Sequence, residues 1–238
     1  MEAIDSKPDR PQPHGTRHTK AMVFVGGEIG ISPPPNPEAF VVGCDSGYDH
    51  AIAKGHTVDL LVGDLDSITP SGLASALASG IEIERHPPDK DATDFEISVD
   101  ACSLRGITEV AIYGGEGGRV DHLLAIATAL TSDKWRSLSL TWHTAHGVTR
   151  PITGPTELTI DVTDGANVSL TAVTDCKGVT TRGLAWGLDE ETLPRGTSRG
   201  MSNIAQSESV TVALDSGSLL ITTSTDHPQH DIEETPSP

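Results

Sequence analysis

The sequence predicts two domains: an N-terminal three-layer α/β domain with a largely parallel sheet, and a C-terminal all-β sandwich. From Ala21 onward, short apolar runs alternate with longer amphipathic ones, which is typical of α/β units. After about Gly147 the pattern changes to alternating Thr, Val and Leu broken by Gly, Asp and Asn, which indicates antiparallel strands. The 238 residues are enough for one large core or two smaller ones, and the change of pattern favours two.

Each element follows from its local pattern. Apolar runs predict strands of the first domain at 21–25, 40–44, 59–62, 81–85 and 109–113. Amphipathic segments between them predict helices at 48–54, 70–79, 94–104 and 121–130. Alternation predicts strands of the second domain at 157–162, 167–172, 210–214 and 218–222.

The domain boundary is expected within 147–155, where Pro151, Gly154 and Pro155 disfavour regular structure. The domains then cover 20–147 and 148–224. Residues 1–19 and 225–238 are polar, contain proline and have few apolar side chains, so both are expected to be disordered.

The overall charge limits the partners. Lys and Arg number 16 against 34 Asp and Glu, a net charge of -18 that repels nucleic acid and anionic lipid. We therefore expect no nucleic-acid and no membrane partner, although a nucleotide could bind through divalent cations. Cys44, Cys102 and Cys176 are scattered, which argues against a disulfide framework or a zinc site. The polar N-terminus and the absence of a run of about 20 apolar residues indicate a cytoplasmic protein.

Asp64 and Asp66 form the first polar cluster, directly after the apolar run 60–62. Carboxylates two residues apart project to the same side of an extended segment, so the pair could share a hard cation such as Mg²⁺. The alternative is a simple turn at the end of a strand, because Asp and Ser favour turns.

A second cluster contains Asp89, Asp91 and Asp94, just before a predicted helix. Thr93 and Glu96 fit a capping box, and carboxylates suit the positive end of a helix dipole. Capping does not explain three aspartates within six residues, since their repulsion is unfavourable without a cation or a proton. Capping alone and capping with metal binding both stay open.

The third cluster is a glycine-rich turn at 114–119, between a strand and a helix. It matches neither a P-loop nor G-x-G-x-x-G. Its glycines would let backbone N–H groups approach a phosphate, and Arg119 offers a bidentate fork. Asp121 could be a simple N-cap, and His122 is interpreted as a surface residue.

Together the three clusters resemble the thiamine pyrophosphokinase family. The family pattern G-D-[FL]-D-S, D-x-D-x-T-D and G-G-R-x-D-H is matched in order at 63–67, 89–94 and 117–122. The segment 45–48 is similar to A-D-G-G-A, but less closely. In the β-rich half, 183–188 and 202–203 match G-L-x-[WY]-x-L and S-N, so the resemblance covers roughly 21–222.

The resemblance implies an enzyme that transfers pyrophosphate from ATP to the hydroxyl of thiamine, with Mg²⁺ as cofactor, giving thiamine diphosphate and AMP. It implies an ATP-binding catalytic α/β domain, a thiamine-binding β-sandwich and a homodimer whose active site lies at the subunit interface. The implied catalytic residues are Asp64, Asp66, Asp91, Asp94 and Asp121, of which the first four hold the metal. The implied ATP-binding residues are Asp45, Asp66, Ser67, Thr93, Gly117, Gly118 and Arg119. The implied thiamine-binding residues are Trp186, Ser202 and Asn203.

Trp186 suits thiamine because an aromatic face attracts the permanent positive charge of a thiazolium ring. The alternative is that Trp186 belongs to the core of the β domain. Ile97 stands where family members often carry Lys, and Ser46 replaces a glycine. Two other functions therefore stay open: a pyrophosphokinase for another small alcohol such as a hydroxymethylpterin, and a non-catalytic protein that binds a nucleotide or thiamine.

Overall fold

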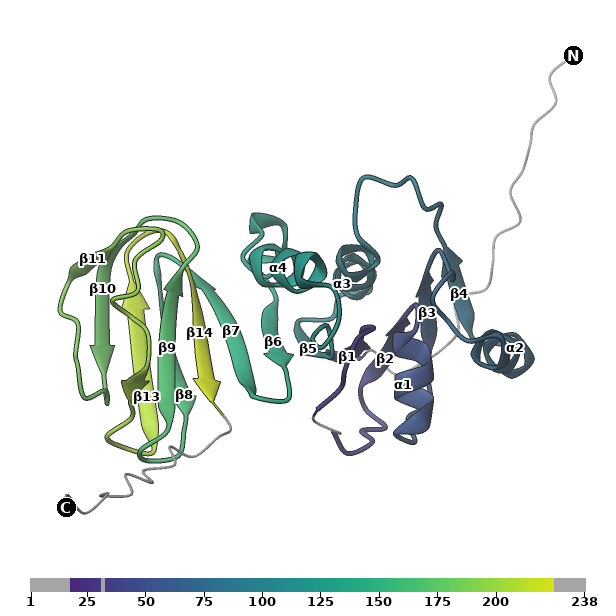
Figure 1. The fold of residues 1–238 in the computed structure, drawn as a ribbon, viewed down its shortest axis with the longest axis horizontal. Coiled ribbons are helices and arrows are strands. Elements are labelled where there is room, and N and C mark those ends of the chain that lie inside the picture. The colour runs from purple at the N-terminus through teal and green to yellow at the C-terminus, as the bar shows by residue number, and fades with distance from the viewer. Residues whose placement is uncertain (1–17, 31–32, 225–238) are drawn as a thin grey trace, which may run out of the picture.

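The computed structural model describes residues 18–30 and 33–224, and its first part is built on six parallel strands (Figure 1). These strands are β1 Lys20–Phe24, β2 Phe40–Cys44, β3 Leu60–Gly63, β4 Glu82–Arg85, β5 Glu109–Tyr113 and β6 Ser139–His143. The helices are α1 Gly47–Ala53, α2 Pro70–Ser79, α3 Asp94–Leu104 and α4 Val120–Ala129, followed by a short 3-10 helix at Asp133–Trp135.

The helices cover both faces of this parallel sheet, which confirms the predicted three layers. Phe95 of α3 and Ile126 of α4 share a core with Val23 on one face. Tyr48 of α1 and Ala76 of α2 share a second core with the next residue, Phe24, on the other face. Adjacent residues of a strand point to opposite faces, so both faces of β1 are buried.

The second part is an antiparallel sandwich, as predicted. Its strands are β7 Gly147–Thr153, β8 Thr156–Asp161, β9 Asn167–Ala172, β10 Cys176–Arg182, β11 Glu191–Leu193, β12 Asn203–Ile204, β13 Ser209–Leu214 and β14 Ser218–Ser224. One sheet has the order β11-β10-β13-β8, and β12, β9, β14 and β7 form the facing layer. Val168, Val212 and Ile221 are among the fully buried side chains between the layers.

One sheet runs through both parts of the chain. Its order is β12-β9-β14-β7-β6-β5-β1-β2-β3-β4, and β7 joins the parts by pairing antiparallel with β6. The expectation of irregular structure at 147–155 is therefore wrong, because β7 spans Gly147–Thr153. Pro151 is tolerated there because β6 pairs only with Val148 and Thr149, so at Pro151 the strand has β14 as its single neighbour.

In the order β6-β5-β1-β2-β3-β4, the chain adds β2, β3 and β4 on one side of β1 and then adds β5 and β6 on its other side. The point at which this order reverses lies between β5 and β1. In open α/β sheets, ligands bind beyond the carboxyl ends of the strands near such a switch point. The turn at 114–119 follows β5, and the turns after β2 and β3 lie beside it on the same rim.

The predicted disordered tails fall outside the described residues, except for His18 and Thr19. The carbonyl of Thr19 accepts a hydrogen bond of 3.1 Å from the backbone N–H of Glu109, so this residue is anchored to the sheet. Within 18–30 and 33–224, no helix is long and apolar enough to cross a membrane.

Candidate active site

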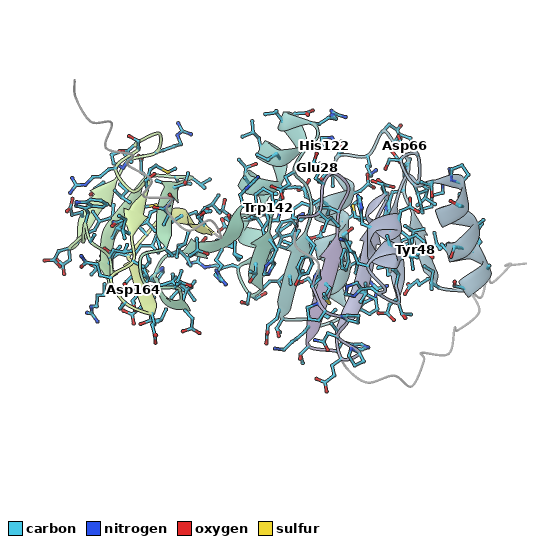
Figure 2. The ribbon with its side chains drawn as sticks, turned by 60° about the horizontal axis from the view of Figure 1, so that its bottom comes forward. Glu28, Tyr48, Asp66, His122, Trp142 and Asp164 are labelled. Atoms are coloured by element: carbon cyan, nitrogen blue, oxygen red, sulfur yellow. The ribbon has the colours of Figure 1, made fainter. Side chains whose placement is uncertain are left out.

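Loops at one rim of the parallel sheet carry all three polar clusters. Figure 2 shows Glu28, Asp66 and His122 along the same side of the sheet, although they follow different strands. Parallel neighbours deliver their carboxyl ends to one edge, so residues far apart in sequence meet there. The rim is therefore the place to look for a composite site.

Three aspartates form a compact group on this rim. Asp45 follows β2, Asp64 follows β3 and Asp94 is the first residue of α3. Each offers a ligand oxygen, and these oxygens all lie within 4.8 Å of one another. Carboxylates at this spacing can share one hard cation. The sequence did not predict Asp45 as a ligand, and the group forms because β2 and β3 are parallel neighbours.

Asp45 is held tightly in an unusual backbone conformation. Its φ is 49°, and its carboxylate accepts a 2.9 Å hydrogen bond from the N–H of Leu65. Gly63 makes room for this carboxylate, because a Cβ there would lie 1.9 Å from Oδ1 of Asp45. Burial is the main reason that the pKa of Asp45 is raised to about 7, and the charges of Asp94 and Asp64 raise it further. The site therefore favours positive charge.

Asp66 and Asp91 are exposed and lie outside this group of three. The backbone N–H of Asp66 donates to Oδ1 of Asp64 at 3.0 Å, which folds the turn as an Asx motif. The charge of Asp64 raises the pKa of Asp66. Ser67 is also exposed, and its hydroxyl accepts a long 3.4 Å hydrogen bond from the N–H of Ser46. Metal binding by Asp66 and Asp91 stays a prediction.

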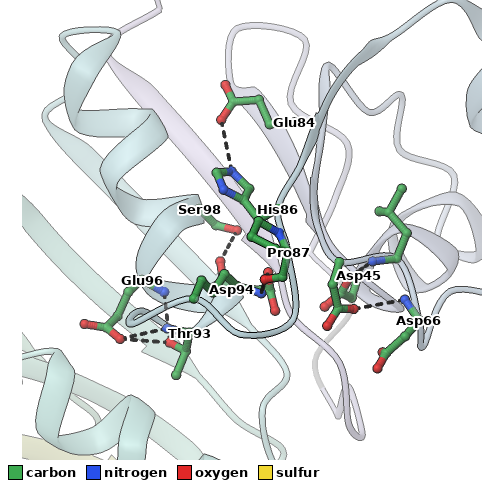
Figure 3. A network of polar contacts seen from close by, with 12 residues as sticks. Asp45, Asp66, Glu84, His86, Pro87, Thr93, Asp94, Glu96 and Ser98 are labelled. Carbon is green, nitrogen blue, oxygen red and sulfur yellow. Dashed lines mark hydrogen bonds and ion pairs between the residues drawn. The ribbon is translucent and has the colours of Figure 1, made fainter.

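The start of α3 holds Asp94 in place (Figure 3). Thr93 and Glu96 form the predicted capping box, with hydrogen bonds of 3.2 and 3.0 Å. Ser98 donates a 2.8 Å hydrogen bond to the carbonyl of Asp94. The carboxylate of Asp94 forms an ion pair of 2.8 Å with Lys90, a residue that sequence reasoning did not single out. Its position four residues before Asp94 was the feature of the sequence that could have indicated this ion pair.

The glycine turn is anchored to the loop after β1. Gly115 donates to the carbonyl of Gly26 at 2.8 Å, and Glu28 donates to that of Glu116 at 2.7 Å. Gly117 has a φ of 72° and packs against the side chain of Glu28, whereas Gly118 faces open space.

Arg119 and Asp121 pair with each other on the surface. Nε of Arg119 donates to the Asp121 carboxylate at 3.2 Å, and both side chains are exposed. This hydrogen bond is the main reason that the pKa of Asp121 falls to about 2. Asp121 does not cap α4, because Arg119 is the N-cap residue and the cap has no side-chain hydrogen bond. The N–H groups of His122 and Leu123 in this turn donate to the carbonyl of Arg119 at 3.1 and 3.2 Å, so the turn favours an anion mainly through the positive end of the helix dipole. His122 is exposed, as expected.

Trp186 lies on the surface of the sandwich rather than in its core. Its exposed fraction is 62%, which overturns the alternative that it is a core residue. Asn203 is buried. Its side-chain amide accepts a hydrogen bond of 3.1 Å from the backbone N–H of Trp186 and donates one of 2.7 Å to the backbone carbonyl of Trp186. Asn203 therefore positions the Trp186 loop. Ser202 has a φ of 55° and is exposed next to it.

The acidic group and Trp186 are far apart within the chain. Asn203, which holds Trp186, lies in β12 at one edge of the long sheet, whereas Asp45 follows β2, seven strand positions away. Strands are about 4.8 Å apart, so this offset along the sheet is about 34 Å.

The fold and the rim define a two-part α/β and β-sandwich protein with an acidic site suited to a cation. Sequence comparison agrees: residues 36–140 match the model "Thiamin pyrophosphokinase, catalytic domain", and residues 155–219 match "Thiamin pyrophosphokinase, vitamin B1 binding domain". The chain belongs to the thiamin pyrophosphokinase family and is an enzyme of that class.

Solved structures share the fold. A thiamin pyrophosphokinase family protein from Enterococcus faecalis is 22% identical, with a TM-score of 0.77, over 87% of this chain and 99% of that one. Thiamine pyrophosphokinase from Bacillus subtilis is 20% identical with the same coverage and a TM-score of 0.78. Thiamin pyrophosphokinase from Candida albicans is 14% identical, over 95% and 98% of the two chains, with a TM-score of 0.74. A search of curated protein sequences gave no match.

Proposed function

We propose that this protein catalyses the Mg²⁺-dependent transfer of the β,γ-diphosphoryl group of ATP to the primary hydroxyl of thiamine. The new bond joins the thiamine oxygen to the β-phosphorus, the bond from the β-phosphorus to the α,β-bridging oxygen breaks, and AMP leaves with that oxygen. The hydroxyl proton passes to a base. The observation that carries the proposal is the group of Asp45, Asp64 and Asp94 at the rim of the family's catalytic domain.

The acidic group suits Mg²⁺, which prefers oxygen ligands and carries the positive charge that this site favours. Asp45, Asp64 and Asp94 would hold the ion, with Asp66 and Asp91 on the exposed side near the phosphates. The bound ion would neutralise charge on the triphosphate.

The chain's own groups would orient the phosphates. Backbone N–H groups of Gly117 and Gly118 would be the donors, with open space at Gly118, and the positive end of the α4 dipole would favour the phosphate charge. Arg119 would exchange its surface pairing with Asp121 for the triphosphate, since a bidentate pair with phosphate is charge-assisted in the same way. Asp45, Ser67 and Thr93 complete the proposed nucleotide contacts.

The sandwich would bind thiamine. Trp186 presents an exposed aromatic ring that suits a cationic heterocycle, and Asn203 fixes the backbone that carries it. Ser202 lies beside Asn203 as a further polar contact. The match of residues 155–219 to a vitamin B1 binding domain supports thiamine over a hydroxymethylpterin.

The sheet topology supports a homodimer. Hydroxyl and β-phosphorus must come within about 3.5 Å to react, yet the acidic group and the Trp186 loop lie about 34 Å apart by strand count. A second chain that places its sandwich over the rim resolves this conflict. A symmetric dimer would then have two identical sites, each using Asp45, Asp64 and Asp94 of one chain and Trp186 of the other.

The test is turnover by purified protein with ATP, Mg²⁺ and thiamine, following AMP and thiamine diphosphate by chromatography. We expect equal amounts of both products, and loss of both with EDTA. Folded protein that forms neither product with Mg²⁺ or Mn²⁺ would contradict the proposal. Binding of thiamine and an ATP analogue without turnover would instead identify a non-catalytic binding protein.

A further inference from the structure

Lys90 has a position that metal binding by Asp45, Asp64 and Asp94 does not by itself explain. It lies in the loop between β4 and α3, and only 12% of its side chain is exposed. Its ammonium is 2.8 Å from Oδ1 of Asp94 and 3.4 Å from the carbonyl of Pro87. A lysine is seldom buried unless its charge is balanced, so the ion pair accounts for this burial.

The charge of Lys90 is balanced by the same three aspartates that would hold the metal. Burial lowers the pKa of Lys90, but the ion pair with Asp94 and the charges of Asp64 and Asp45 outweigh burial and raise it. The ammonium thus supplies part of the positive charge that the group needs. A divalent cation that binds Asp94 must weaken this ion pair, because both draw on one carboxylate charge.

Ile97, at the position where the resembled family often carries Lys, is apolar and cannot supply a second cation. Ile97 lies one turn into α3 and packs against the core that contains Phe95 and Val99. Lys90 has a long flexible stem and starts next to the same carboxylate, so its ammonium can turn toward an anion that arrives with the metal.

We propose that Lys90 is an exchangeable counter-ion: it pairs with Asp94 while the site lacks metal and contacts the substrate's phosphates once the metal binds Asp94. This rests on the proposed function, because it requires a divalent cation at Asp45, Asp64 and Asp94. Lys90 is thereby a phosphate-binding residue.

The exchange predicts opposite effects on two affinities. Lys90→Met removes a competitor of the metal, so Mn²⁺ should bind the nucleotide-free protein about three- to tenfold more tightly in calorimetry. The same variant should bind α,β-methylene ATP with Mg²⁺ about tenfold more weakly, because a charge-assisted contact to phosphate is lost. If the ion pair between Lys90 and Asp94 only stabilised the loop, its loss would not shift the affinities for Mn²⁺ and for the ATP analogue in opposite directions.

Matched variants provide the controls. Lys134 is also paired with an α3 carboxylate, Asp100, at 3.1 Å, so Lys134→Met should leave both affinities unchanged. Lys90→Arg keeps the charge and should bind Mn²⁺ within about twofold of wild type. Lys90→Gln serves if the Met variant does not fold, as judged by circular dichroism.

Two results separate the possible failures. If wild type binds Mn²⁺ but Lys90→Met and Lys90→Gln bind it equally or more weakly, or bind the ATP analogue as wild type does, the exchange is refuted and the proposed function stands. If wild type binds no Mn²⁺, the cation site is refuted, and the exchange fails with it.

Discussion

Replacing Gly63 with alanine should disrupt the acidic group without touching any charged residue. The added Cβ would lie 1.9 Å from Oδ1 of Asp45, whereas ordinary contact begins at 3.4 Å, so the carboxylate must move by about 1.5 Å. This movement breaks its 2.9 Å hydrogen bond with Leu65, a loss of about 1.5–3 kcal/mol for a bond to a charged group. The φ of 147° at Gly63 adds about 1–3 kcal/mol of backbone strain for alanine.

The expected total is about 3–5 kcal/mol, which lowers the Tm by about 10 °C for a chain of this length. Mn²⁺ affinity should fall at least about tenfold, because Asp45 leaves its place in the group. Gly80→Ala is the matched control: its φ is 67°, but no atom lies within 4 Å of the added Cβ. It should cost only about 1 kcal/mol and leave Mn²⁺ binding unchanged. Thermal melts and calorimetry that show equal effects for both variants would refute the reasoning.

Three further predictions concern single residues of the site. Asp64→Asn should reduce turnover by about a hundredfold or more while the Tm stays near that of wild type, and a fully active variant would remove Asp64 from the metal group. Trp186→Ala should raise the KM for thiamine about tenfold with little change in the KM for ATP, because in the proposed site the exposed ring would contact thiamine and not the nucleotide; equal changes in both would contradict this role. The raised pKa of Asp45 means that, without metal, its contribution to stability is present below about pH 4 and is lost as the pH rises toward 7. The Tm of Asp45→Asn relative to wild type should therefore increase between pH 4 and 8 by a few degrees, since the group is partly exposed, and a constant difference would contradict the shift.

Local patterns were sufficient where neighbouring residues determine an element. Phe40–Cys44, Pro70–Ser79 and Asp94–Leu104 have the predicted bounds, because apolar runs and Thr caps act locally. Strands β6, β7, β10, β11 and β12 were missed. Cys176–Arg182 of β10 contains Gly178 with a φ of 63°, an irregularity that hides the strand pattern in the sequence.

The sequence predicted which polar clusters lie at the rim, but not which of their side chains contact one another. Asp64 and Asp94 meet as the family resemblance implied, yet their third partner, Asp45, comes from the neighbouring strand, which local sequence does not specify. Lys90 was not predicted, because its proposed role depends on how the loop between β4 and α3 turns its side chain toward Asp94. The position of Trp186, far along the sheet, depends on the β6–β7 pairing that joins the two parts into one sheet.

The central claim is one active site built from the acidic group of one chain and Trp186 of another. The most direct test purifies a heterodimer, through two different tags, in which one chain carries Asp64→Asn and the other carries Trp186→Ala, and assays it at a thiamine concentration where each homodimeric variant is nearly inactive. Sites formed between chains leave one of the two sites intact, so we predict about half of the wild-type activity. Activity no higher than that of either homodimeric variant would contradict the account, because sites formed within one chain would both be defective.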